Sequence, residues 1–242
     1  MEDITSIKQW MIDVLSAPKK NYDALALEEI ERIDASGKRP RLLMHVCCGP
    51  CSCYPLTFLC PHFDVTLYYN NSNIYPPSEF DRRQHELIKL LDDLKRDYGF
   101  EVGLVLPPYD NDSYNEFLAP YADEKEGGPR CKLCYERRMR EAYDYAEKEG
   151  FDYFCTVMTI SRQKSSLILN AVGRDLEAEG HKTKYFYSDF KKRNGLLKGK
   201  AIREKYGLYN QDYCGCIYSL REREKKKALS KSNVNENEKI GD

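Results

Sequence analysis

The sequence lacks the features that would place it in a membrane or outside the cell. None of its apolar runs approaches the roughly 18 residues of a membrane span. Its first residues do not follow the charged, apolar and small-residue order of a signal peptide. We therefore expect a cytoplasmic protein. Its ten cysteines would then stay reduced and act as metal ligands, redox groups or small buried residues, not as disulfides.

The sequence also lacks internal repeats and a strong overall charge. Its 242 residues include 38 basic and 39 acidic side chains, a net charge of -1, and the length suits one main domain. The charge is uneven, because residues 189–231 contain 13 Lys and Arg against 5 Asp and Glu, a local +8 that leaves -9 elsewhere. This asymmetry is typical of proteins that bind phosphates with one face. A solvated helix surface remains an alternative.

The pattern of apolar residues predicts alternating strands and helices. Strands are expected at 41–46, 65–69, 102–106 and 153–158, and helices from about 52, at 78–98, from about 135 to 149, and at 163–179. Such alternation indicates an α/β fold, a Rossmann-like parallel sheet with helices on both faces. We assign this domain to 39–229, an N-terminal helical extension with helices at 4–15 and 22–33 to 1–38, and a polar, disordered tail to 230–242.

Seven of the ten cysteines fall in three tight clusters: Cys47, Cys48 and Cys51; Cys131 and Cys134; Cys214 and Cys216. The first cluster follows a predicted strand, at the end where open α/β sheets bind their ligands. Neighbouring cysteines are poor disulfide partners, since a disulfide needs particular Cα separations and Cβ directions. The clusters therefore indicate a thiolate metal site. The other three cysteines, Cys53, Cys60 and Cys155, have apolar surroundings and are expected in the core.

The number of clustered thiols favours redox chemistry over a structural metal. A structural zinc site takes four ligands, usually from two repeated knuckles, and no repeated knuckle is present. A four-iron four-sulfur cluster also takes four cysteines, which leaves three thiols for a second redox or metal function. The pair Cys131 and Cys134 also matches a thioredoxin-like redox motif, which remains an alternative.

Two other segments are expected near the thiols. Residues 156–164 run from a strand into a turn rich in Thr, Ser, Arg and Lys, whose hydroxyls and helix N-terminal amides suit an anionic group. Asp189 lies among aromatic and basic residues and is a candidate metal ligand, proton donor or helix cap. His45, just before the first cysteines, is a candidate proton donor or a plain core residue.

Taken together, these motifs resemble the epoxyqueuosine reductase QueH family. The resemblance covers roughly residues 39–224 and rests on five segments in the same order, at 45–51, 130–137, 161–164, 189–192 and 213–219. It implies an adenine-nucleotide alpha-hydrolase type of Rossmann-like fold. It also implies a cobalamin-independent oxidoreductase that performs the last step of queuosine biosynthesis, the two-electron deoxygenation of epoxyqueuosine to queuosine at the wobble position of tRNA.

The resemblance further implies a 4Fe-4S cluster and an additional iron ion. It assigns Cys47, Cys48, Cys131 and Cys134 to the cluster. The second metal, or a reservoir of redox-active thiols, would lie among Cys51, Cys214, Cys216 and Asp189, and we expect Asp189, Cys214 and Cys216 to be catalytic. The expected partners are the tRNA anticodon loop and an unidentified low-potential electron donor, with no membrane.

Two functions from other classes remain open from the residues alone. A nucleotide hydrolase or sulfurtransferase of the PP-loop type would need an SGGxDS-like phosphate loop after the first strand, where this chain has Cys47 to Cys51. A zinc-stabilised RNA-binding module without catalysis is the second alternative, and it predicts a colourless protein.

Overall fold

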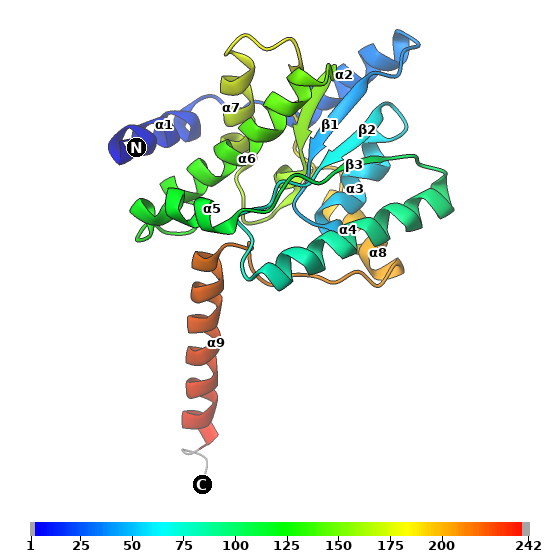
Figure 1. The fold of residues 1–242 in the computed structure, drawn as a ribbon. Helices are drawn as coiled ribbons and strands as arrows, with labels where there is room; N and C mark the ends of the chain where they lie inside the picture. Colours follow the sequence, from blue (N-terminus) through cyan, green and yellow to red (C-terminus); the bar gives the residue numbers. More distant parts are fainter. Residues whose placement is uncertain (1–2, 239–242) are drawn as a thin grey trace.

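The strands form one parallel sheet in the order β3-β2-β1-β4-β5 (Figure 1). The computed structural model of the chain describes residues 3–238. The strands are β1 (Arg41–His45), β2 (Asp64–Tyr68), β3 (Gly103–Val105), β4 (Tyr153–Thr156) and β5 (Lys184–Tyr185). The central strand β1 pairs with β2 on one side and β4 on the other. The predicted α/β fold with a parallel sheet is confirmed.

Helices cover both faces of the sheet. They are α1 (Ile4–Ser16), α2 (Tyr22–Ala35), α3 (Gly49–Leu59), α4 (Pro77–Tyr98), α5 (Asn111–Leu118), α6 (Pro129–Lys148), α7 (Ser166–Glu177), α8 (Gly195–Lys205) and α9 (Ile217–Glu238), with short 3₁₀ helices at Ala119–Tyr121 and Val157–Ile160. Leu42 and Met44 of β1 pack into one hydrophobic cluster with α3 and α4, whereas Leu43 packs into another with α6 and α7. This alternation is what a strand buried on both faces requires.

The two N-terminal helices join different faces of the domain. Helix α1 contacts α6 and α7, and its Ile7 packs beside Leu133 and Cys134. Helix α2 buries Ala26 and Ile30 in the cluster on the opposite face. The segment expected to be an N-terminal helical extension thus packs into hydrophobic clusters on both faces of the sheet.

Several predicted boundaries need correction, and two corrections affect the site. Helix α3 begins at Gly49 and α6 at Pro129, both earlier than predicted, because proline in the first turn suits a helix start. Cys51, Cys131 and Cys134 are therefore helical residues. Strand β4 ends at Thr156, where a 3₁₀ turn begins, and α7 starts only at Ser166. The elements α5, β5 and α8 were not predicted, and α9 was expected only as the alternative of a solvated helix surface.

Helix α9 projects from the body of the protein (Figure 1). It continues to Glu238. The disordered tail expected at 230–242 stays a prediction, and residues 239–242 lie outside the described residues. Within 3–238, no helix is long and apolar enough to cross a membrane.

Candidate thiolate metal site

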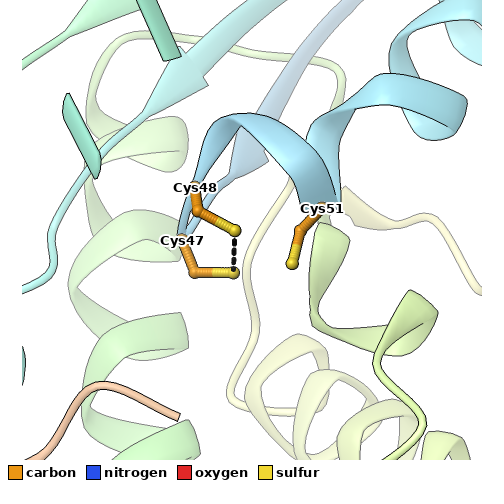
Figure 2. Close-up of side chains that lie close together, drawn as sticks. All are labelled: Cys47, Cys48 and Cys51. Carbon is orange, nitrogen blue, oxygen red and sulfur yellow. Dashed lines mark hydrogen bonds between the residues drawn. The ribbon is translucent and has the colours of Figure 1, made fainter. Parts of the chain in front are cut away.

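The first cysteine cluster forms a compact group at the carboxyl end of β1. The sulfur atoms of Cys47, Cys48 and Cys51 lie within 4.8 Å of one another, and those of Cys47 and Cys48 are 3.8 Å apart (Figure 2). Cys48 is the N-cap of α3, in an extended conformation. A Cβ on Gly49 would stand 2.7 Å from the carbonyl oxygen of Glu86, so only glycine lets α3 start so close to α4.

Negative charge in this group concentrates on Cys47. Hydrogen bonds from the Cys48 and Cys51 thiols, helped by nearby cations, hold the pKa of Cys47 well below its usual value. Burial, with its bond to Cys47, raises the pKa of Cys48 to about 12. The bonds to its neighbours raise the pKa of Cys51 as well. The side-chain amide of Gln211 donates to the Cys48 sulfur at 2.8 Å.

The second cluster occupies the start of α6, where both sulfurs accept hydrogen bonds. The backbone N–H of Gly127 donates to Cys131 at 3.2 Å, and the Tyr114 hydroxyl donates to Cys134 at 3.4 Å. Burial raises the pKa of Cys131 to about 12, and the charge of Cys214 adds to this effect. The second and third clusters therefore lie close enough to interact electrostatically.

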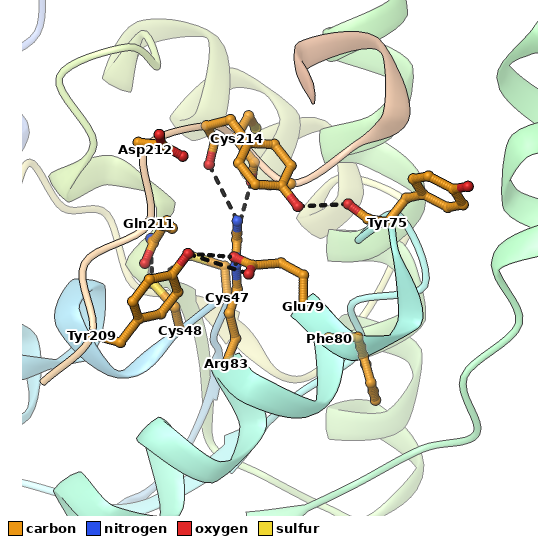
Figure 3. Close-up of polar contacts among 12 residues, drawn as sticks. Cys47, Cys48, Tyr75, Glu79, Phe80, Arg83, Tyr209, Gln211, Asp212 and Cys214 are labelled. Atoms are coloured by element: carbon orange, nitrogen blue, oxygen red, sulfur yellow. Dashed lines mark hydrogen bonds and ion pairs between the residues drawn. The ribbon is translucent and has the colours of Figure 1, made fainter. Parts of the chain in front are cut away.

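The third cluster is fixed by a buried arginine. Arg83 of α4, which is 1 % exposed, donates to the carbonyl oxygens of Cys214 at 3.0 Å and Tyr213 at 3.3 Å (Figure 3). Its Nε also bonds to Glu79 at 2.7 Å. Gly215 between the two cysteines has a φ of 129°, which a side chain rarely adopts. Arg83 thus holds the Cys214 loop against α4, beside Cys47 and Cys48 (Figure 3).

Asp189 and His45 have different surroundings. The Asp189 carboxylate accepts a hydrogen bond from Ser166 at 3.1 Å and pairs with Lys191 at 3.1 Å. It lines a surface pocket with residues of the loop between α1 and α2, and no described contact joins it to a cysteine. His45 is buried with its Nδ1 2.8 Å from Thr156 Oγ1, and burial holds its pKa well below the usual value. It is therefore neutral at pH 7.

Sequence reasoning missed three residues around the thiols: Arg83, Arg138 and Gln211. Only Arg138 could have been found, since it follows Cys134 by four residues and so shares its helix face. Lys164 lies in the turn predicted to hold an anionic group, and Cys214, Cys47 and Cys51 raise its pKa. Arg83 and Gln211 reach the site only through tertiary packing.

The donor set fits a thiolate-bound metal. Cys47, Cys48 and Cys51 are the one group of at least three metal-ligating side chains within mutual reach in the described part of the chain. Three soft sulfur donors suit iron-sulfur clusters, zinc or Cu(I), and they do not suit magnesium or calcium.

The family model described as "Epoxyqueuosine reductase QueH" matches residues 42–222. The chain belongs to this family. A curated relative of that name from Streptococcus pyogenes serotype M1 is 37 % identical over 203 residues, covering 84 % of this chain and 79 % of the relative. One from Staphylococcus aureus (strain Mu50) is 34 % identical over 211 residues, covering 86 % and 88 %.

A more distant relative, the epoxyqueuosine reductase QueH of Thermotoga maritima, is 28 % identical over 190 residues, covering 77 % of this chain and 94 % of the relative. The matched region contains all three cysteine clusters and ends within α9. Membership in this family makes the chain an oxidoreductase. It favours a reductase over the nucleotide hydrolase and the non-catalytic RNA-binding module, which the residues alone left open.

Proposed function

We propose that this chain reduces epoxyqueuosine to queuosine in tRNA, using a thiolate-bound iron-sulfur cluster and a nearby iron. The observation that carries the proposal is the compact group of Cys47, Cys48 and Cys51 at the ligand-binding end of the sheet, in a chain whose curated relatives are named epoxyqueuosine reductases. A reductase needs a redox group. This group of thiols is the best place for one among the described residues.

The reaction consumes two electrons and two protons. The two C–O bonds of the epoxide break, a carbon–carbon double bond forms, and the oxygen leaves as water. Strain in the three-membered ring favours this direction. The electrons come from an external low-potential donor, and the protons come from acidic groups of the protein or from water.

The three cysteine clusters divide the metal ligands between them in our proposal. Cys47, Cys48, Cys131 and Cys134 hold a 4Fe-4S cluster, and Cys51, Cys214, Cys216 and Asp189 surround the additional iron. When bound, these groups supply single electrons at low potential and a Lewis acid for oxygen. Asp189 would need a rearrangement to bind the iron, because its carboxylate is paired with Lys191.

Side chains around the thiols orient them. Gln211 donates to Cys48 and Tyr114 donates to Cys134, so each hydroxyl or amide fixes the direction of one sulfur. Hydrogen bonds to sulfur also stabilise its negative charge. Arg83 keeps the Cys214 loop in place through its two bonds to backbone carbonyls.

The pKa values favour a thiol as the proton source. His45 is buried and neutral, so it has no imidazolium proton to give at pH 7. Burial raises the pKa of Cys216 to about 11, so this thiol keeps its proton at neutral pH in the metal-free protein. In this role Cys216 is a reservoir thiol beside the iron and not its ligand, because a metal-bound thiol loses its proton.

A surface pocket beside Cys214 suits an unpaired nucleotide. Its volume is about 290 Å³, and its lining includes Gln163, Tyr213, Cys214 and Lys226. Bases of an anticodon loop are unpaired and can enter such a pocket, where aromatic rings and cations contact the base and its phosphates. The pocket also adjoins α9, which contains five of the cations of the +8 region between Arg221 and Lys227.

The proposal is tested by converting tRNA that carries epoxyqueuosine. The protein is purified without oxygen, reconstituted with iron and sulfide, and incubated with this tRNA and dithionite, and the nucleosides are analysed by mass spectrometry. We expect queuosine from the wild type and from Cys60→Ala, whose cysteine is a buried core residue. Cys47→Ser should lose conversion. Retention of epoxyqueuosine by fully reconstituted wild type would refute the proposal.

A further inference from the structure

Arg138 carries a buried charge without a carboxylate partner. It is 2 % exposed, and its guanidinium bonds only to neutral groups, the Asn71 side-chain oxygen and the Met158 sulfur. Its Nε–H has no hydrogen-bond partner among residues 3–238, and no ion pair with it is found in that range. Guanidinium cannot be deprotonated in a protein, so this charge needs a nearby anion.

The position of Arg138 puts it between two cysteine clusters. On α6 it follows Cys131 by seven residues and Cys134 by four, so all three share one helix face. Asn71, which accepts from Arg138, donates to the carbonyl oxygen of Val46 at 2.8 Å. Val46 directly precedes Cys47, so this chain of contacts joins α6 to the first cluster.

The groups that can place negative charge near Arg138 are cysteine side chains and the Tyr114 hydroxyl. Burial opposes its positive charge, but the negative charges of Cys134 and Cys47 raise the pKa of the guanidinium above its usual value. Lys164, on the loop before α7, is a second cation without an ion pair in the described part of the chain. Burial and the charge of Arg138 lower the pKa of Lys164, and the charges of Cys214, Cys47 and Cys51 outweigh both effects.

Arg83 differs from Arg138 because it has a carboxylate partner. It also lies near Cys48, but its Nε is 2.7 Å from a carboxylate oxygen of Glu79, which neutralises its charge. Arg138 and Lys164 have no such carboxylate, so their charges remain available to a negatively charged centre. A cation beside a redox centre stabilises the reduced form, which is the more negative one, and so raises the reduction potential.

We propose that Arg138, assisted by Lys164, is the counter-ion of the thiolate-bound redox centre and raises its reduction potential. The inference rests on the proposed function only in requiring that the thiols hold a redox-active metal centre. It concerns the potential, not the identity of the substrate. Arg138 acts through the centre and is a positioning residue, not a catalytic one.

The test is a potentiometric titration of the anaerobically reconstituted protein, followed by electron paramagnetic resonance. In Arg138→Gln we expect the ratio of reduced to oxidised centre at a fixed potential to fall at least about tenfold. For a one-electron couple this equals a lowering of the reduction potential by about 59 mV. Lys164→Met should shift the potential in the same direction. Arg138→Lys should retain the wild-type potential, because it keeps the charge.

The matched control is Arg137→Gln, because Arg137 is the next residue on α6 but pairs with Glu141 at 3.2 Å. It should leave the potential unchanged. If Arg138→Gln does not fold, Lys164→Met carries the test. Wild-type potential in Lys164→Met or in folded Arg138→Gln would overturn the inference, as would the absence of any redox centre. Shifted potentials without conversion of epoxyqueuosine would support it and contradict the proposed function instead.

Discussion

Arg83 of α4 and Cys214 are joined by a buried hydrogen bond of 3.0 Å from guanidinium to backbone carbonyl. Arg83 also donates to the carbonyl oxygen of Tyr213. The two bonds connect the last cysteine pair to α4, the helix that packs beside the first cluster. Cys214 lies more than 130 residues after Arg83 in the sequence. The third cysteine cluster is therefore held near the first although the two are far apart in the sequence.

Breaking this contact should destabilise the protein. In Arg83→Met the carboxylate of Glu79 would stay buried without its partner, and two carbonyls would lose their donor. We expect a loss of about 3–5 kcal/mol in the free energy of unfolding, measured by urea denaturation. The double variant Glu79→Met/Arg83→Met should recover part of it. If the double variant is as unstable as the single one, the buried charge of Glu79 is not the cause.

Gly215 should not tolerate a side chain. Its φ of 129° is strained for other residues, and a Cβ there would lie 3.0 Å from Arg83 Nη1. Gly215→Ala should cost about 2 kcal/mol or more of stability. The control is Gly207→Ala, with φ of 59° and open space around the Cβ, which should cost only about 1 kcal/mol. Equal losses of unfolding free energy in the two variants would contradict the proposed crowding.

The metal-free, reduced protein should react first at Cys47. Because the pKa of Cys47 is well below that of an ordinary thiol, Cys47 keeps a larger thiolate fraction than an ordinary cysteine as the pH falls from 9 to 7. Burial raises the pKa of Cys60 to about 12, so this thiol stays protonated over that range. Peptide mapping after brief alkylation with iodoacetamide should show Cys47 labelled at least about tenfold faster than Cys60, at a rate that falls less with pH than that of a free cysteine. A rate for Cys47 that falls with the thiolate fraction of a free cysteine would refute this.

The sequence predicted the sheet well and the site only in part. Periodicity located β1 and the cysteines that follow it, since burial on both faces leaves a strong apolar signal. The two-residue strand β5 and the polar helix α8 leave no such signal. Arg83 was missed because its role depends on packing against residues 213 and 214. All the metal-ligand assignments stay predictions, those of Cys131, Cys134 and Asp189 included.

Binding of tRNA should depend on the basic segment before α8. Lys192 is exposed and Arg193 stacks on Phe58 at 5.6 Å, whereas Lys191 is engaged with Asp189. Changing Lys192 and Arg193 together to Ala should weaken binding. It should also reduce the steepness of the plot of log binding constant against log salt concentration by about 1.4–1.8. The control is Lys148→Ala, at the end of α6 away from the thiols, which should leave the slope unchanged. An unchanged slope in the double variant would show that this segment does not contact the RNA phosphates.

The central claim is that the clustered thiols hold a redox-active iron centre. The most direct measurement is the visible absorption spectrum, with iron and acid-labile sulfide content, of protein purified without oxygen. The account predicts a brown protein with a broad band near ~400 nm that bleaches with dithionite, about four sulfides and more than four irons per chain. Cys47→Ser should lose this band, and Cys60→Ala should keep it. A colourless wild type that binds stoichiometric zinc even after anaerobic reconstitution would contradict the account.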